Sequence, residues 1–235
     1  MKETDLSILA EKHLDRETTD IILKYRGYIE SYISLYPEFA TTLVPWINNV
    51  SDPNIIAPNI VAPNIIAPNI INDMIKAGIK ANVGPMAAVA GAIAEYVGKD
   101  LMVHSREVVV ENGGDIFLML NGTITIGIFA GESPLSMKMG VCIDTKNQPL
   151  AVCTSSGTIG HSLSMGKADA VCVISRSCSL ADAAATSIGN QIKTKADINK
   201  SIDFGKKIDG IIGIVVIMDD KIGLWGDIEV IPLKT

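Results

Sequence analysis

Short apolar runs separated by glycine turns restrict the fold of this sequence more than any other feature. Residues 107–111, 115–120 and 123–129 are predicted to be three strands, joined by Asn112-Gly113-Gly114 and by Asn121-Gly122. Asn and Gly tolerate the positive φ that a tight turn requires, so such residues between apolar runs predict hairpins. We therefore expect a sheet that is at least partly antiparallel.

Helices and further strands are interspersed with these hairpins. Strands are also expected at 137–143, 150–154, 168–174, 210–218 and 222–225, and helices at 18–36, 70–81, 86–97, 179–192 and 198–207, with a short helix through Phe39 and Leu43. Because there is no run of βαβ units, the pattern favours an α+β fold of mostly antiparallel sheets over a doubly wound one.

Small and punctuating residues predict where the helices end and what they pack against. Thr18 or Thr19 is expected to cap the first helix. Pro85 should begin the next long helix and Gly98 should lie just past its end. Residues 86–94 are apolar all round and small, so this helix should be buried on several faces with close backbone approach.

Charge and composition exclude several classes of protein. The 235 residues carry a net charge of −6 and no run of Lys or Arg, which argues against a nucleic-acid partner. The first twenty residues are charged throughout, so we expect no export signal and a cytoplasmic location. The longest uncharged stretches are broken by Pro, Asn, Ser and Gly, which argues against a membrane span. Composition does not change abruptly, so a single domain over 1–235 is expected.

A five-residue repeat covers residues 55–69, where Ile-(Ile/Val)-Ala-Pro-Asn occurs three times. Proline at every fifth position removes amide donors and disfavours a regular helix or a central strand. We therefore expect an irregular Pro/Asn connection over 53–69. It is either a tolerant loop lengthened by replication slippage or a contact for a structural partner.

Asp182 and Thr186 are the first candidate site. They lie four residues apart in the predicted helix 179–192, so their side chains share one helical face. A carboxylate and a hydroxyl are hard oxygen ligands suited to Mg²⁺, and a helix start with free amides suits an anion beside the metal. An alternative stays open, because Ser179 and Asp182 also match a capping box and Thr186 could bond to its own helix.

Two glycine-containing segments are further candidates. Gly113 and Gly114 allow the backbone to approach a ligand closely, and Asp115 can orient a ligand hydroxyl or act as a base, although an ordinary turn explains the same residues. The loop after strand 150–154 can supply amides and hydroxyls to phosphate oxygens, with a histidine as ligand contact, acid–base group or merely solvated side chain. Its residues are Thr154, Ser155, Ser156, Gly157, Thr158 and His161.

The four cysteines, Cys142, Cys153, Cys172 and Cys178, form no C-x-x-C pair, so free thiols are expected. Cys178 lies just before the predicted helix start at Ser179. Because a helix N-terminus lowers the pKa of a thiol, Cys178 is the one cysteine with a physical reason for reactivity, but an inert thiol is favoured over a reactive one.

In this order, the segments resemble the ApbE-like family, the metal-dependent enzymes that split FAD and attach FMN to a Thr or Ser of a target protein. Residues 112–116 are similar to its Asn-(Leu)-Gly-Gly-Asp-Ile segment, and residues 181–186 to its Ala-Asp-Ala-Leu-Ala-Thr metal motif. Residues 90–95 resemble its Lys-Gly-Tyr-Ala-Val-Asp helix, with Ala90 in place of the lysine. The correspondence covers residues 84–192.

The resemblance implies a function and a set of partners. Asp182 and Thr186 would be Mg²⁺ ligands, FAD or FMN would bind along the loop from Thr154 to His161, and the fold would resemble a duplicated T-fold. A nucleotide or flavin and a protein acceptor would be the partners, with a homo-oligomer left open. The resemblance also leaves two activities open. One is cleavage or transfer of a nucleotide pyrophosphate, and the other is binding without hydrolysis, as in a component of sulfur assimilation towards homocysteine.

Overall fold

A computed structural model describes residues 5–47, 67–146, 148–157 and 165–233 of the chain. Two antiparallel sheets carry the fold. The larger sheet has the strand order β1-β2-β3-β6-β7-β8-β9 and the smaller has the order β10-β5-β4. The larger contains β1 (Leu6–Ala10), β2 (Val108–Asn112), β3 (Asp115–Met119), β6 (Leu150–Ser155), β7 (Ala170–Ser175), β8 (Ile211–Met218) and β9 (Lys221–Gly226); the smaller contains β10 (Glu229–Pro232), β5 (Met139–Asp144) and β4 (Thr123–Gly127).

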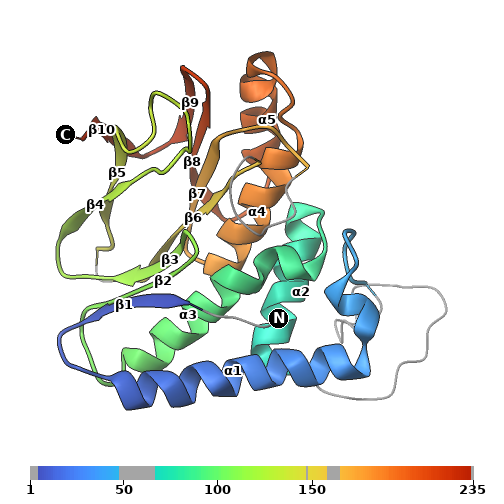
Figure 1. Ribbon diagram of the computed structural model, residues 1–235, viewed down its shortest axis with the longest axis vertical. Coiled ribbons are helices and arrows are strands. Elements are labelled where there is room, and N and C mark those ends of the chain that lie inside the picture. The colour runs from blue at the N-terminus through green and yellow to red at the C-terminus, as the bar shows by residue number, and fades with distance from the viewer. Residues whose placement is uncertain (1–4, 48–66, 147, 158–164, 234–235) are drawn as a thin grey trace.

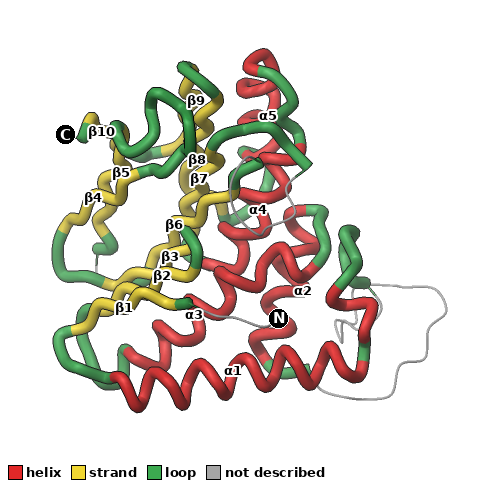
Figure 2. Tube along the Cα trace, in the orientation of Figure 1, coloured by secondary structure: helices red, strands yellow, loops and turns green. Residues whose placement is uncertain are grey.

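The helices lie on one side of the larger sheet, and the smaller sheet lies on the other side (Figure 1). Figure 2 shows the same separation of helices from strands. The helices are α1 (Asp15–Leu35), α2 (Asn69–Ala81), α3 (Val89–Leu101), α4 (Cys178–Asn190) and α5 (Ile198–Gly205), with 3-10 turns η1 (Pro37–Ala40), η2 (Pro85–Ala88) and η3 (Lys195–Asp197).

Strand alternation divides the core between the two layers. In β3, Phe117 packs in the core under the helices and Leu118 packs in the core between the sheets. In β6, Cys153 and Val152 divide in the same way. Successive side chains of a strand point to opposite faces, so a residue's position in its strand decides which layer it meets. Asp115, two residues before Phe117, therefore faces the helices.

The α+β prediction is confirmed, and the eight predicted strands lie within three residues of observed ones. The turn before Asp115 is a two-residue hairpin in which Gly113 and Gly114 both have positive φ, at +62° and +101°. The second predicted hairpin is wrong, because β4 pairs with β5 and the chain crosses to the smaller sheet after β3. At this crossing the buried hydroxyl of Thr145 donates to the carbonyl of Leu120 (2.6 Å). This bond satisfies the Leu120 carbonyl, which a hairpin would have paired with a backbone amide.

Three predictions about helix ends are also wrong. Helix α1 begins at Asp15, so Thr18 and Thr19 lie in its first turns, and Thr19 donates to the Asp15 carbonyl. The short helix ends at Ala40 rather than near Leu43. Helix α3 continues through Gly98, where a Cβ would lie 2.1 Å from the ring of Phe117. Glycine is required there by close packing and not by a helix end.

The short edge strands of the two sheets, β1 and β10, were not predicted from the sequence. The predicted irregular repeat 53–69 lies outside the described residues except for 67–69, where Pro68 precedes α2 and Asn69 begins it. Within the described ranges, each helix taken singly falls short of the length and apolarity needed to cross a membrane. Helix α2 and the segment Pro85–Leu101 meet both criteria only as a pair bent by 107°.

Candidate functional site

The start of β3 places Asp115 against the helical layer. Asp115 follows the double-glycine turn, and the turn is fixed to β6 because the amide of Thr154 donates to the carbonyl of Gly114 (3.1 Å). In the sheet register Asp115 is paired with Cys153 of β6. Asp115 is 7% exposed, and its Oδ1 atom is buried and has no hydrogen-bond partner in the part of the chain that the structure describes. Such an atom is costly unless a ligand or a proton satisfies it.

Helix α4 brings Asp182 to the same place. The backbone amide of Gly91 in α3 donates to Oδ2 of Asp182 (2.9 Å). A Cβ on Gly91 would lie 2.4 Å from the carbonyl oxygen of Cys178 and 2.8 Å from Cβ of Asp182. Only glycine therefore lets α3 and α4 approach closely enough for this bond, as the small residues of the helix predicted.

The two carboxylates share one electrostatic environment. Burial raises the pKa of Asp182 from 3.8 to about 7, although the hydrogen bond from Gly91 lowers it in part. Burial and then the negative charge of Asp182 hold the pKa of Asp115 well above its ordinary value. Among the described residues, no lysine or arginine forms an ion pair with either side chain. Two buried carboxylates without a cation favour sharing a proton or binding a metal ion.

Two further hydroxyl groups, those of Thr186 and Ser155, lie on α4 and β6, the elements that pack at this pair. Thr186 lies one helical turn after Asp182 and is 8% exposed. The hydroxyl of Ser155, two residues after Cys153 and on the same face of β6, is buried without a partner. The alternative for Thr186 was a hydrogen bond from its hydroxyl to a backbone carbonyl of α4. Among the described residues, the Thr186 hydroxyl forms no such bond.

These oxygens fit a hard divalent cation. The carboxylates of Asp182 and Asp115 and the hydroxyl of Thr186 are oxygen donors of the kind that Mg²⁺ prefers. In the part of the chain that the structure describes, no three His, Cys, Asp or Glu side chains gather so that they could hold a metal by themselves. A cation here would therefore need the hydroxyl and oxygens from water or a phosphate. Mg²⁺ usually binds in this way.

The other predicted ligand-binding residues divide into two groups. Gly113 and Gly114 lie next to Asp115 and form the turn that fixes it. Thr154 faces the layer between the sheets by strand alternation, so its side chain points away from Asp115, and its amide is already bonded to Gly114. Ser156 is half-buried and Gly157 is exposed at the end of β6. Thr158 and His161 lie outside the described residues.

The start of α4 differs from the prediction in its cap. The helix begins at Cys178, and Ser177 caps it by accepting a hydrogen bond from the amide of Leu180 (3.3 Å). The capping box of Ser179 and Asp182 is therefore wrong, because Asp182 bonds to α3 instead. The amides expected to be free for an anion are also taken: the carboxylate of Glu95 accepts from Cys178 (2.8 Å) and Ser179 (3.2 Å).

Glu95 was not among the predicted site residues, although the sequence carries a signal for it. Glu95 is the only charged residue between Met86 and Gly98, in a helix that is otherwise apolar and small. A carboxylate in such a helix is buried together with its neighbours and must find partners there. That isolated charge could have identified Glu95 as a group that contacts another buried element.

The structure supports the inert thiol that was favoured for Cys178 and contradicts the lowered pKa that a helix start alone would give. Cys178 is fully buried, its sulfur lies 3.5 Å from that of Cys153, and burial raises the pKa of its thiol to about 11. Burial raises the pKa of Cys153 as well. The effect of burial exceeds that of the helix terminus, since Glu95 already neutralises the terminus.

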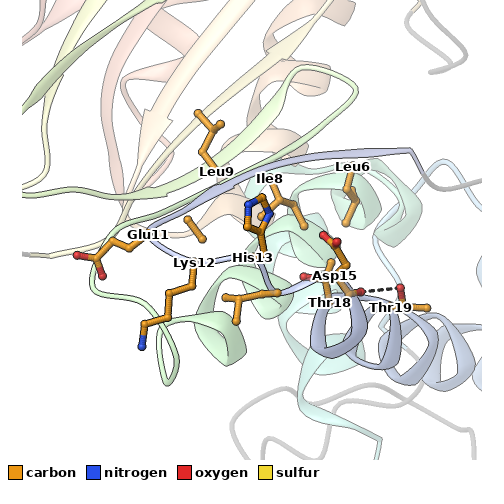
Figure 3. Close-up of a pocket in the computed structure, with 11 residues that line it drawn as sticks. Leu6, Ile8, Leu9, Glu11, Lys12, His13, Asp15, Thr18 and Thr19 are labelled. Atoms are coloured by element: carbon orange, nitrogen blue, oxygen red, sulfur yellow. Dashed lines mark hydrogen bonds between the residues drawn. The ribbon is translucent and has the colours of Figure 1, made fainter.

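A separate hollow of about 580 Å³ lies between β1 and the first turn of α1. Figure 3 shows His13 beside Ile8 and Asp15 in this hollow, with Thr18 and Thr19 on the helix. None of the predicted site residues lines it. Asp115 and Asp182 are buried and do not line the hollow, so the hollow and the carboxylate pair are different places in the molecule.

A comparison with protein families decides where the chain belongs. The family model described as AbpE bacteria matches residues 1–220. The chain belongs to this family. Its relatives include a UPF0280 protein of Methanococcus aeolicus, 42% identical over 212 residues that cover 88% of this chain and 79% of the relative. The UPF0280 protein of Methanocaldococcus jannaschii is 38% identical over 234 residues, covering 97% and 89%. The family-level resemblance drawn from the motifs is confirmed.

Solved structures similar to this AbpE-family chain include flavin transferase ApbE from Vibrio cholerae, with a TM-score of 0.41 and 16% identity over 95% of this chain and 78% of that chain. The apo form of the Pseudomonas stutzeri flavinyl transferase ApbE has a TM-score of 0.41 and 17% identity, covering 95% and 75%.

Proposed function

We propose that the chain binds a divalent cation, Mg²⁺, through Asp182 and Thr186 on the side that faces Asp115, and through it the pyrophosphate of a flavin nucleotide such as FAD. One observation carries the proposal. Two carboxylates lie buried together, and among the described residues they have no cationic side chain as a partner and one of their oxygens accepts no hydrogen bond. A divalent cation held by Asp182 would offset the negative charge of the pair, and the unpartnered oxygen of Asp115 would stay available to accept a proton.

The motifs support a flavin nucleotide as the ligand. Residues 181–186 and 112–116 resemble the metal motif and the double-glycine segment of the ApbE-like flavin transferases, and the structure brings these two segments together at Asp182 and Asp115. The turn at Gly113 and Gly114 has no side chain that would obstruct a ligand: a Cβ on Gly113 would meet nothing within 4 Å.

The activity that we propose is transfer of FMN from FAD to a hydroxyl of a protein acceptor. The bond between the FMN phosphorus and the bridging oxygen breaks, AMP leaves with that oxygen, and the acceptor oxygen bonds to phosphorus. A bound cation would neutralise charge on the phosphate oxygens during this displacement. Asp182 is oriented by the Gly91 amide, Thr186 supplies a hydroxyl, and Asp115 accepts the proton that the acceptor hydroxyl loses. His161 stays a prediction as a second acid–base group.

Incubation with FAD and MgCl₂, with and without a Thr-containing acceptor protein, tests this proposal. Release of AMP, with flavin covalently bound to protein, is the expected result. Asp182→Asn and Thr186→Val should each abolish it, whereas Asp203→Asn and Thr19→Val, which alter exposed residues of α5 and α1, should not. Equal AMP release by wild type and Asp182→Asn would contradict the assignment of the site.

Binding without hydrolysis is the second candidate, because Ala90 stands where the resembling enzymes have a lysine. It predicts that FAD with Mg²⁺ raises the melting temperature of the protein although no AMP is released. Rapid FAD cleavage would dispose of this alternative.

A further inference from the structure

Glu95 in α3 makes a dense set of contacts at the start of α4. Glu95 is buried, with only 4% of its surface exposed. Oε2 accepts hydrogen bonds from the amides of Cys178 (2.8 Å) and Ser179 (3.2 Å), and from the hydroxyls of Ser177 and Ser179 (both 3.4 Å). Oε1 forms an ion pair with Lys99 (2.6 Å). The carboxylate thus takes the place that an external anion has at many helix N-termini.

The contact with Glu95 has a counterpart one turn away. Gly91, four residues before Glu95 in α3, donates its amide to Asp182, which lies four residues after Cys178 in α4. The two helices are therefore joined at two points, each one helical turn apart on both partners, or about 6 Å along each axis. Two such points fix both the height of α4 and its rotation about its own axis, which a single contact would not.

We propose that Glu95 is a positioning residue for the cation site: it fixes α4 so that Asp182 and Thr186 face Asp115. The inference rests on the proposed function for the cation itself, but the two contacts that join α3 to α4, at Glu95 and at Gly91, exist without a cation. Loss of the carboxylate should release the first turn of α4, lengthen the bond between Gly91 and Asp182, and misplace the oxygen donors without removing any of them.

The test compares Glu95→Gln with Lys99→Gln. The first removes the charge that holds the amides of Cys178 and Ser179, while the second removes only the half-exposed partner of Oε1. Two quantities are measured at a temperature where each variant is fully folded: Mg²⁺ affinity by calorimetry, with MgCl₂ alone as the probe, and hydrogen exchange of the Gly91 amide by NMR. We expect Glu95→Gln to weaken Mg²⁺ binding by roughly tenfold or more. Exchange at Gly91 should become faster by about the same factor. Lys99→Gln should change neither by more than about twofold.

Each outcome decides the proposal. If Glu95→Gln lowers the melting temperature but leaves Mg²⁺ affinity and Gly91 exchange as in the wild type, Glu95 is only a structural cap and the proposal is wrong. If the wild type binds no Mg²⁺, the proposed function fails, and Gly91 exchange alone decides whether Glu95 positions α4. Should Glu95→Gln not fold, Glu95→Asp keeps the charge but shortens the side chain by one methylene. It should change both quantities in the same direction, and wild-type values would refute the proposal.

Discussion

Replacing Asp182 by Asn should stabilise the metal-free protein at alkaline pH. The carboxylate of Asp182 is buried beside Asp115, and burial raises its pKa from 3.8 to about 7. At pH 8 the native state must therefore hold a charge that would be better solvated in the unfolded chain. Asn is neutral, has nearly the same shape, and keeps an oxygen that can accept from the Gly91 amide.

The pKa values give the size and the sign of the effect. The folded-state pKa lies above the unfolded value, so between pH 3.8 and 7 the native state binds more protons than the unfolded state. The stability contributed by the protonated carboxyl is complete below pH 3.8 and is lost as pH rises through 7. The loss reaches up to about 4 kcal/mol by pH 8, of which about 2.5 kcal/mol falls between pH 5 and pH 8.

Urea unfolding in EDTA at pH 5 and pH 8 measures this difference. Relative to Asp182→Asn, the wild type should lose about 2.5 kcal/mol of unfolding free energy between the two pH values. Added MgCl₂ at pH 8 should stabilise the wild type and not the variant. Parallel pH dependence of wild type and variant would refute the idea that a buried, ionising carboxylate lies at this position.

Three further predictions follow from individual contacts. Cys178 should resist iodoacetamide at pH 8 in the native protein and react after denaturation, because burial raises the pKa of its thiol to about 11. Peptide mass spectrometry measures the labelling, and native labelling at the rate of a free thiol would contradict this prediction. Gly91→Ala should destabilise the protein by about 1–3 kcal/mol in thermal unfolding and abolish Mg²⁺ binding. The matched control is Gly27→Ala in α1, where a Cβ meets nothing within 4 Å, and it should stabilise the protein by about 0.5–1 kcal/mol. Ser155→Ala should stabilise the metal-free protein by about 1 kcal/mol in urea unfolding, since it removes a buried hydroxyl that has no partner among the described residues, yet it should weaken FAD binding; equal binding would count against a ligand contact.

The fold class could be predicted because local signals agree with it. The apolar runs and the turn at Gly113 and Gly114 indicate an antiparallel sheet, and the structure contains that hairpin. Asn121 and Gly122 carry the same local signal, but the chain there crosses between sheets. A side chain 25 residues away, Thr145, bonds to Leu120 at that point. No window around Asn121 contains this information, because the contact exists only after the two sheets have packed.

The candidate site was predictable only where local spacing decides the geometry. Spacing places Asp182 and Thr186 on one helical face, and that follows from helix geometry alone. The closeness of Asp182 to Asp115 depends on how α4 packs against β3 and β6, which the spacing does not specify. A helix terminus was the only reason in the sequence for a lowered pKa at Cys178, and the sequence does not show that Glu95, 83 residues earlier, already occupies that terminus.

Diffraction from crystals grown with MnCl₂ and without nucleotide tests the cation site most directly. An anomalous peak is predicted within about 2.5 Å of both the Asp182 carboxylate and the Thr186 hydroxyl, on the side that faces Asp115, and it should be missing from Asp182→Asn crystals. A wild-type map with no peak at this position in millimolar Mn²⁺, or an equal peak in the variant, would contradict the account.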